Sequence, residues 1–348
     1  MREELRRDNY RYGLDRISGR LLIEFVPTGS RYTLVCSPDN FATGQVLSVE
    51  HRGGTAAVAK RNYRMKTVEK MARVFARRVD RSWRNRLAVA LQGVSLDGVG
   101  LEIAPYFEPL ILKREYDVLY ADHIDNREIQ TKAAANPGSF GRVPPAIDFV
   151  WASGRRLRDC APAGLVLDYI VASHVIEHVP DAIGWLLELF EMVRVGGRVI
   201  LLVPDRRHTM DYHRRETSPA DLIDAWFRRL RRPSPAQIFD FASRNVDSAG
   251  KLGTRSFERG VPFEEARRHY TDADALRLAT HSWASGEYLD IHCTVWTPAS
   301  FVHAMVTLAQ LGIINMHVCD PVERRIEFAI HLIKQGEPAV AHPGGESA

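Results

Sequence analysis

Residues 165–203 read LVLDYIVASHVIEHVPDAIGWLLELFEMVRVGGRVILLV. The stretch opens and closes with apolar runs, 165–172 and 198–203, each long enough for a buried strand. Between them, Asp181 can cap a helix and Gly196-Gly197 can end it. The apolar residues of that helix recur at the spacing of one buried face: Ile183, Leu186, Leu187, Phe190 and Val193. The stretch therefore predicts a strand, a helix and a second strand in succession.

The same alternation continues on both sides of this stretch. Before it lie three candidate strands, at 96–103, 117–120 and 146–151. After it come a helix at 298–311 and two strands at 314–318 and 326–333. The short connection between the last two strands favours an antiparallel hairpin. This pattern predicts an α/β domain with a mostly parallel sheet.

The rest of the chain divides by composition. We expect a small β-rich unit at 1–58, a basic amphipathic helix or linker at 59–94, and the α/β domain at 95–334. The tail at 335–348 is rich in Gly, Pro and Ala, which predicts disorder.

An Arg-rich insertion at about 205–290 interrupts the α/β domain. It is predicted to be helical at 219–232 and 262–284, and to form a lid over the edge of the sheet. Phe239, Phe241 and Trp283 give it apolar surface with which to dock. A further strand is expected just after it, at 288–296.

Composition excludes several classes of protein. The 348 residues carry a net charge of +4, and 45% are hydrophobic, as in soluble globular proteins. No apolar run is long enough to span a bilayer, and the charged N-terminus is unlike a secretory signal. The four cysteines form no C-x-x-C pair, which excludes a zinc ribbon and favours a reducing cytoplasm.

Much of the basic excess lies at 60–86, where apolar residues recur at helical spacing. One interpretation is an ordinary helix docked on the next domain with its basic face in water. The other is a surface for phosphates or acidic lipid headgroups. Nucleic-acid methylation would also need such a surface, but binding of a nucleic acid is the less favoured prediction.

Two short motifs carry contrasting signals. Gly98-Val99-Gly100 precedes an apolar run instead of opening a helix, so it predicts a turn into a strand and not a dinucleotide site. Asp122 follows the second predicted strand, about 20 residues after Glu102. An acidic residue there can accept hydrogen bonds from both ribose hydroxyls of a nucleotide-like ligand, although it can equally be a carboxylate of an ordinary turn.

Residues 174–178 read HVIEH, which matches the H-x-x-E-H signature of a class of zinc peptidases. That chemistry needs both imidazoles on one helical face. Here the motif lies between a predicted strand and Pro180, which leaves about one turn of helix. We therefore predict no metal, and place Ser173, His174, Glu177 and His178 at the carboxyl end of a strand, where open α/β sheets bind ligands.

Four segments together carry a family resemblance: 101–103 (LEI), 120–123 (YADH), 167–181 and 193–201 (VRVGGRVIL). They resemble the S-adenosylmethionine-dependent methyltransferases of the seven-stranded Rossmann-like class. Residues 203–207 (VPDRR) and 286–292 (GEYLDIH) are similar to a bacterial subgroup associated with surface-glycan gene clusters and glycosyltransferase modules. The resemblance implies a seven-stranded, mostly parallel sheet that ends in an antiparallel hairpin.

The resemblance also implies a set of cofactor-binding positions for S-adenosylmethionine. Glu102 matches the acidic residue of the first motif, near the methionine moiety, and Asp122 matches the ribose-binding acid. Asp148 and Phe149 fall where the class contacts adenine, and Ser173 and His174 match the loop beside the sulfonium. The full set of implied cofactor-binding residues is Glu102, Ile103, Ala104, Pro105, Asp122, His123, Asp148, Phe149, Ser173 and His174.

One motif departs from the class. After the first strand the class usually has E-x-G-x-G-x-G, whereas residues 102–108 read EIAPYFE, without glycine. Side chains at Ala104, Tyr106 and Glu108 oppose the close approach of backbone to ligand. This departure keeps open a second hypothesis, a non-catalytic binding module of the same fold.

The resulting prediction is an enzyme of the cytoplasm that transfers a methyl group to a hydroxyl of a small molecule, glycan or sugar nucleotide. His174, His178 and His292 are the candidate general bases, because the usual pKa of histidine lies near neutrality. Glycosyltransferase or surface-glycan machinery is the expected partner. Zinc peptidase is the least favoured alternative.

Overall fold

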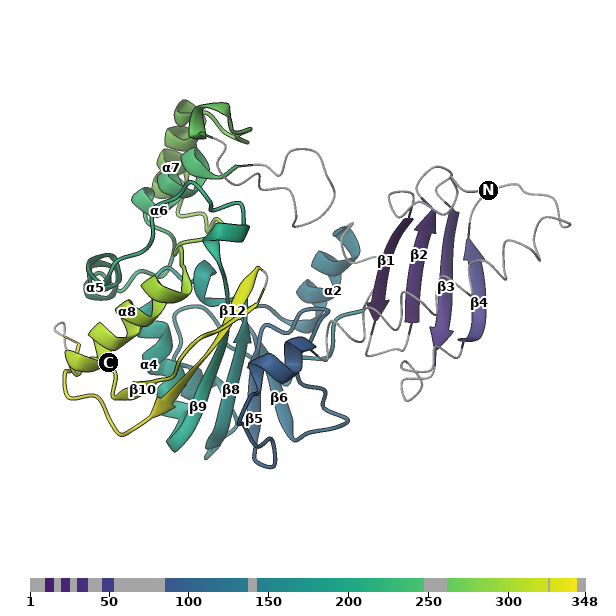
Figure 1. The fold of residues 1–348 in the computed structure, drawn as a ribbon, viewed down its shortest axis with the longest axis horizontal. Coiled ribbons are helices and arrows are strands. Elements are labelled where there is room, and N and C mark those ends of the chain that lie inside the picture. The colour runs from purple at the N-terminus through teal and green to yellow at the C-terminus, as the bar shows by residue number, and fades with distance from the viewer. Residues whose placement is uncertain are drawn as a thin grey trace, which may run out of the picture. The chain divides into compact units, whose positions relative to one another are not determined.

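The computed structural model describes residues 10–15, 20–25, 30–36, 46–52, 85–136, 143–246, 262–324 and 326–342 (Figure 1). Most of the predicted basic helix, at 59–84, lies outside the described residues. The chain forms two compact units. One consists of 1–88, 105–115 and 124–148, and the other of 89–104, 116–123 and 149–348.

The first unit contains a four-stranded antiparallel sheet in the order β1-β2-β3-β4. Its strands are β1 (Tyr10–Asp15), β2 (Arg20–Phe25), β3 (Ser30–Cys36) and β4 (Val46–Arg52). Four strands therefore lie within 1–58, where β structure was expected, although the compact unit also takes in 105–115 and 124–148. The unit also includes helix α2 (Asn126–Ala135), which Asp125 caps by accepting a hydrogen bond from the Glu128 N–H.

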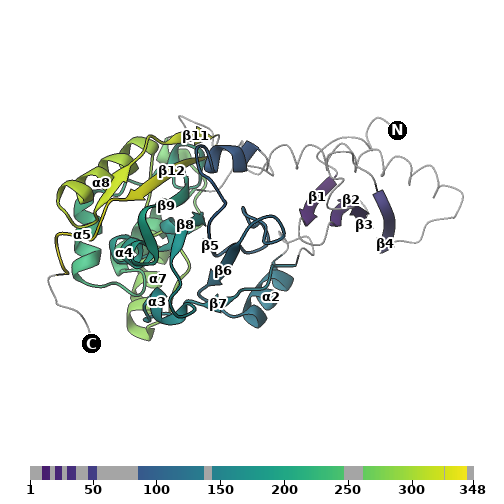
Figure 2. The ribbon, with the colours of Figure 1, turned by 90° about the horizontal axis from the view of Figure 1, so that it is seen from below.

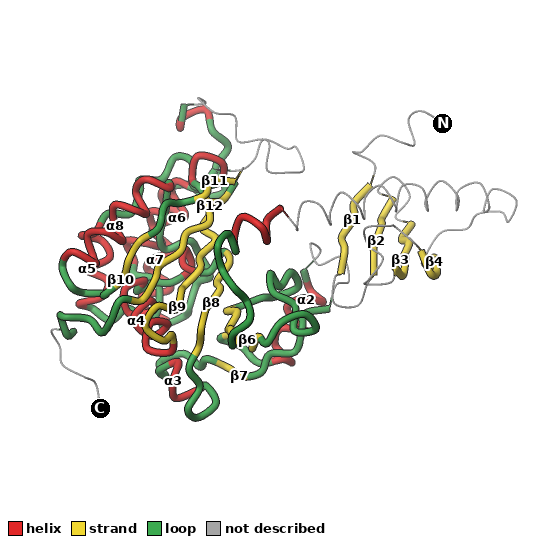
Figure 3. The backbone as a smooth tube through the Cα atoms, turned by 60° about the horizontal axis from the view of Figure 1, so that its bottom comes forward, coloured by secondary structure: helices red, strands yellow, loops and turns green. Residues whose placement is uncertain are grey.

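The second unit is built on a mixed sheet in the order β10-β12-β9-β8-β5-β6-β7, with β11 paired to β12 (Figures 2 and 3). Its strands are β5 (Gly100–Ile103), β6 (Val118–Asp122), β7 (Phe149–Val150), β8 (Leu167–Ser173), β9 (Val193–Pro204), β10 (Met316–Val318), β11 (Val322–Arg324) and β12 (Glu327–Lys334). The pairs from β7 to β9 are parallel, and those that involve β12 are antiparallel.

This arrangement confirms the predicted Rossmann-like α/β fold and its C-terminal hairpin, with two corrections. The sheet has eight strands instead of seven, because Val322–Arg324 adds the short strand β11 beside β12. The predicted strand at 288–296 does not form; the N–H groups of Cys293 and Thr294 bond to the η5 turn (Ile176–His178) and that of Val295 to the Thr217 hydroxyl, instead of to a neighbouring strand. Alternating apolar residues gave the same signal as a strand.

Helices of the second unit pack on the sheet and extend past one end of it (Figure 1). They are α3 (Leu157–Cys160), α4 (Ala182–Met192), α5 (Pro219–Phe227), α6 (Pro235–Arg244), α7 (Asp272–Ser285) and α8 (Pro298–Gln310). Three short 3-10 turns are η5 (Ile176–His178), η6 (Arg206–His208) and η7 (Phe263–Glu265). Residues 85–90 are also helical.

The quoted strand–helix–strand stretch folds as predicted. The Asp181 side chain accepts a hydrogen bond from the Gly184 N–H at the start of α4. Ile183, Leu186 and Phe190 are buried in a core shared with β8, β9 and α8. The helix ends at Met192, before Gly196-Gly197, because β9 already begins at Val193.

The described parts of the insertion, 205–246 and 262–290, contain α5 and α7 within the predicted helical stretches 219–232 and 262–284, but α5 already ends at Phe227 and α7 begins only at Asp272. Helix α6 was not predicted. Helices α6 and α7 pack together around a small apolar cluster with Phe241 at its margin. The other two aromatic residues expected to dock do not: Trp283 is 62% exposed and Phe239 is 39% exposed. Apolar character alone did not indicate which ring faces the protein.

The predicted disordered tail is partly ordered. Ala339 and Val340 donate backbone hydrogen bonds to the Gly312 carbonyl oxygen. His342 lies against Trp226, with Nε2 at 2.8 Å from the Trp226 carbonyl oxygen. The described part of this unit thus continues eight residues beyond 334, to residue 342.

The predicted turn at Gly98-Val99-Gly100 leads into β5. A Cβ atom on Gly100 would lie 2.1 Å from ring carbons of Tyr169 on the adjacent strand β8. Glycine is required here for packing between strands, and not for a ligand. No helix among the described residues is both long and apolar enough to cross a membrane.

A pH-dependent contribution to stability is expected from His331 on β12. Burial, the largest cause, and the charge of Arg198 lower the pKa of His331, against the opposing hydrogen bond to the Ala90 carbonyl oxygen. The unfolded chain therefore binds this proton more readily than the folded protein. His331 stabilises the fold above its unfolded pKa of about 6.5, and this stabilisation is lost as the pH falls through the lower folded pKa.

Urea unfolding between pH 7.5 and 5 tests this expectation. The free energy of unfolding should fall less steeply on acidification in His331→Gln than in the native chain. His303→Gln, on the exposed face of α8, is the matched control for removal of an imidazole. Parallel pH profiles for the native chain and His331→Gln would contradict the assignment.

Candidate functional site

The carboxyl ends of the central parallel strands meet at one edge of the sheet. Ile103 at the end of β5 pairs with Ala121 of β6 on one side and with Ala172 of β8 on the other. The next residues along each strand therefore emerge at the same edge. Ala104, Asp122 and Ser173 share this edge, where open α/β sheets bind ligands.

The loop after β5 keeps glycine-like backbone without glycine. Ala104 has φ 51° and Tyr106 has φ 43°, both left-handed. These are two of the three positions at which the resembled class usually has glycine. Non-glycine residues in this conformation cost roughly 1–2 kcal/mol each, so this part of the loop has the left-handed shape that glycine favours in spite of its composition.

Two buried carboxyl groups belong to the same edge. Glu102 is 1% exposed and Asp122 is 5% exposed. Asp122 Oδ1 lies 2.8 Å from Nδ1 of the exposed His123. The Asp122 carbonyl oxygen accepts a hydrogen bond from the Trp151 N–H, which joins β6 to the chain just after β7.

The remaining predicted cofactor residues are spread over both units. Ile103 is buried in the core, and Phe149 on β7 packs against that core. Pro105 and Asp148 belong to the first unit. There, Asp148 forms an ion pair with Lys113 at 2.5 Å.

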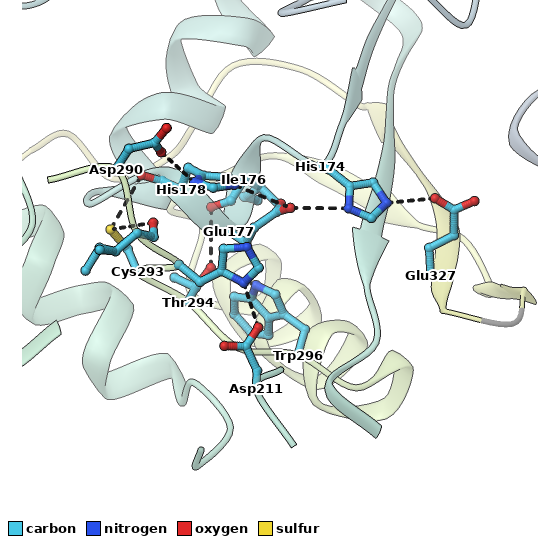
Figure 4. Close-up of polar contacts among 12 residues, drawn as sticks. His174, Ile176, Glu177, His178, Asp211, Asp290, Cys293, Thr294, Trp296 and Glu327 are labelled. Atoms are coloured by element: carbon cyan, nitrogen blue, oxygen red, sulfur yellow. Dashed lines mark hydrogen bonds and ion pairs between the residues drawn. The ribbon is translucent and has the colours of Figure 1, made fainter. Parts of the chain in front are cut away.

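Beyond β8 the chain turns sharply at His174, which has φ 54°. Its N–H donates to the Leu202 carbonyl oxygen. Its ring lies between two buried carboxylates: Nε2 is 2.8 Å from Glu327 Oε2, and Nδ1 is 3.6 Å from Glu177 Oε1 (Figure 4). Left-handed, strained backbone of this kind clusters at functional sites.

His178 lies at the end of η5, between two acidic residues. Its Nδ1 is 2.8 Å from Asp290 Oδ1, and its Nε2 is 4.0 Å from Glu177 Oε1 (Figure 4). Burial lowers the pKa of His178, but Asp290, Glu177 and Asp211 outweigh burial, and the pKa is raised above its usual value.

His292 belongs to a buried network from the insertion. Its Nδ1 is 2.6 Å from Asp211 Oδ2, and Asp211 also accepts a hydrogen bond from Arg214 at 2.7 Å. Arg214 is 1% exposed and forms a second ion pair with Asp240. Burial raises the pKa of Asp211, but His292 and Arg214 outweigh it, and the pKa is lowered overall.

The segment at 293–296 is tied to the η5 turn. The Glu177 carbonyl oxygen accepts the N–H groups of both Cys293 and Thr294, and the Thr294 hydroxyl donates to the Ile176 carbonyl oxygen (Figure 4). Trp296 Nε1 in turn donates to the Thr294 hydroxyl. These bonds bring His292 next to His178, with ring centroids 4.7 Å apart.

The three candidate bases thus have different neighbours. His178 and His292 are in contact, whereas His174 reaches the same Glu177 carboxylate from the β12 side. Sequence reasoning missed Asp211, Asp290 and Glu327 as partners of these rings. Asp290 was visible only as part of the 286–292 motif, and no local pattern distinguishes Asp211 or Glu327.

The H-x-x-E-H peptidase arrangement does not form. Residues Ile176–His178 make a single 3-10 turn, and His174 lies outside it in left-handed backbone. The two histidines therefore do not project from one face of a helix, which that chemistry requires. His174 is instead paired with Glu327.

Comparison with known families agrees with the sheet-edge geometry. A family model described as a methyltransferase domain matches residues 30–306. The chain belongs to the methyltransferase domain family. The match covers most of the chain, including the strands whose ends form the second unit's sheet edge, and it confirms the predicted family.

Solved methyltransferase structures are similar to this chain only distantly. The CcbJ methyltransferase from Streptomyces caelestis is 14% identical, with a TM-score of 0.25, over 35% of this chain and 52% of that chain. An O-methyltransferase family protein from Burkholderia thailandensis is 10% identical, with a TM-score of 0.33, over 75% and 57%. A SAM-dependent methyltransferase from Methanosarcina mazei is 13% identical, with a TM-score of 0.34, over 69% and 94%.

The chain thus spans about half the length of the first two of these structures. None of the curated proteins compared with it matches. Neither the family description nor these three structures names a glycan, so the surface-glycan subgroup and its glycosyltransferase partner stay predictions.

The left-handed backbone at Ala104 generates a stability prediction. Ala104→Gly removes the strain of that conformation while adding entropy to the unfolded chain, so the free energy of unfolding should change by less than about 1 kcal/mol. Ala172→Gly, on buried strand β8, should lower the free energy of unfolding by about 1–2 kcal/mol. Urea unfolding measures both, and equal losses would contradict the strain assigned to Ala104.

Proposed function

We propose that this methyltransferase uses S-adenosylmethionine, bound at the carboxyl edge of β5, β6 and β8. The observation that carries the proposal is Asp122, a 95% buried carboxylate at the end of β6. S-adenosylmethionine supplies a methyl group bonded to a sulfonium sulfur. The neutral thioether that remains after transfer is a good leaving group. The protein has to bind, orient and desolvate the reacting groups.

The residues at this edge fit such a cofactor. Asp122 can accept hydrogen bonds from two ribose hydroxyls, the role of the acidic residue after the second strand in doubly wound sheets. Glu102, buried at the end of β5, places negative charge near the methionine moiety. The left-handed Ala104 favours a glycine-like course of the backbone directly after β5.

The acceptor that we propose is a hydroxyl of a small molecule, glycan or sugar nucleotide. Support comes from the three imidazoles beyond β8, of which His174 and His178 are each about one-third exposed at the side chain. An acceptor hydroxyl must lose its proton as it is methylated, and an imidazole near Glu177 or Asp290 can take it. His174, His178 and His292 remain the candidates for this role.

Calorimetry with S-adenosylhomocysteine tests the cofactor site. Asp122→Ala removes two charge-assisted hydrogen bonds to ribose, each worth roughly 1.5–3 kcal/mol, so affinity should fall by about 100-fold or more. Asp117→Ala is the matched control, because Asp117 precedes the amino end of the same strand. Equal affinities for the Asp122→Ala and native proteins would refute the ribose assignment, and no binding to folded native protein would favour the non-catalytic module.

The acceptor class is tested by methyl transfer from S-adenosylmethionine labelled on its methyl group. Panels of sugar nucleotides, glycans and small hydroxyl compounds are compared with amine compounds of similar size. We expect a labelled methyl ether in the hydroxyl panels. Transfer confined to the amines would contradict O-directed chemistry and leave the cofactor proposal intact.

A further inference from the structure

Glu177, His178 and His292 together have the composition of a metal site. Each offers one ligand atom, and these three atoms lie within 4.8 Å of one another. Glu177 and His178 come from the η5 turn, whereas His292 comes from the segment tied to that turn at Cys293 and Thr294. The trio differs from the H-x-x-E-H pair, since His174 is not part of it.

The environment of the Glu177 carboxylate is the first observation that favours a bound cation at these three residues. Its side chain is 1% exposed, and neither carboxylate oxygen has a hydrogen-bond partner within the described residues. The nearest imidazole nitrogens are 3.6 Å away on His174 and 4.0 Å away on His178. A buried carboxylate without hydrogen bonds is costly, which a bound cation would offset.

The imidazoles provide the second sign. Asp211 Oδ2 lies 2.6 Å from His292 Nδ1, and Asp290 Oδ1 lies 2.8 Å from His178 Nδ1. The hydrogen bond between His292 Nδ1 and Asp211 keeps the proton on that nitrogen and leaves the Nε2 lone pair of His292 for a metal. Asp290 lies at ion-pair distance from His178 Nδ1. Arg214 fixes Asp211 in turn. Carboxylate–histidine pairs of this kind surround metal ions in proteins and set the orientation of the rings.

We propose that Glu177, His178 and His292 bind one divalent transition-metal ion of the zinc class, although the sequence predicts no metal. Two imidazoles and one carboxylate suit such an ion better than Mg²⁺ or Ca²⁺, which prefer oxygen ligands. Three protein ligands leave at least one coordination position open. The 4.8 Å spacing contracts when the ion binds.

The open coordination position can bind the acceptor hydroxyl. This part of the proposal rests on the proposed function. The ion lies in the turn after β8, next to the cofactor edge at Ser173. A hydroxyl oxygen that binds a divalent cation loses its proton at lower pH, and its position is fixed. The site therefore selects acceptors that present a hydroxyl to the metal. His178 and His292 are then ligands and not bases, which leaves His174, beside the Glu177 carboxylate, to receive the proton.

The competing explanation is that Glu177 is only the counterion of a protonated histidine. The two explanations predict opposite changes in stability for the Glu177→Gln variant. If Glu177 is a ligand, the neutral variant in EDTA is at least as stable as the native protein in EDTA, because a buried charge is gone. If Glu177 is a counterion, the variant loses stability and no metal affects it.

The experiment is a ZnCl₂ titration of the full chain, untagged and stripped with EDTA, followed by calorimetry and thermal unfolding. We expect about one Zn²⁺ per chain and a higher melting temperature with zinc. Glu177→Gln should weaken zinc binding by about 100-fold or more, and Asp211→Asn by roughly 10- to 100-fold. With CoCl₂ in place of zinc, the native protein should show a visible absorption band that Glu177→Gln lacks.

The matched control is His281→Gln, a histidine paired with Glu287 on the surface of α7. It should bind zinc like the native protein. Absence of stoichiometric zinc, or native zinc affinity in Glu177→Gln, would overturn the metal site. S-adenosylhomocysteine binding is measured on the same samples. Zinc binding without S-adenosylhomocysteine binding would contradict the proposed function alone. S-adenosylhomocysteine binding without zinc binding would contradict the metal site alone.

Discussion

The hydrogen bonds to the backbone oxygen of Glu177 hold the candidate site together. This oxygen accepts the N–H groups of Cys293 and Thr294, at 2.5 and 3.1 Å. Two segments more than a hundred residues apart therefore meet at one peptide group. The same residue carries a carboxylate that is 1% exposed. A change in the η5 turn moves both its own side chains and the segment that carries Asp290 and His292.

The charged groups of this region are buried or half-buried and lie close to one another. Asp211 lies between His292 and Arg214, and His174 lies between Glu177 and Glu327. Buried pairs of this kind contribute little net stability, because desolvation opposes the attraction between the charges. They do fix the side chains in one arrangement, which transfer of a methyl group along a defined line requires.

Sequence alone predicted those parts of the fold whose signals are local. Apolar runs and the Asp181 cap specify β8, α4 and β9. The segment at 288–296 has the same alternating pattern, but the N–H groups of Cys293 and Thr294 bond to η5 and not to a strand, so the prediction of a strand was wrong. Two features of the site have no local signal in the sequence. Alanine rarely adopts left-handed backbone, so its residue type does not predict the conformation of Ala104. The hydrogen bond between His292 and Asp211 joins groups that are 81 residues apart.

The central claim is that the carboxyl edge of β5, β6 and β8 holds the methyl donor, with Asp122 at its ribose. The most direct measurement is a crystal structure of the protein with S-adenosylhomocysteine. The account predicts both ribose hydroxyls within hydrogen-bond distance of the Asp122 carboxylate, and the sulfur beside Ser173 and His174. A ligand bound away from Asp122, or held there without contact between ribose and this carboxylate, would contradict it.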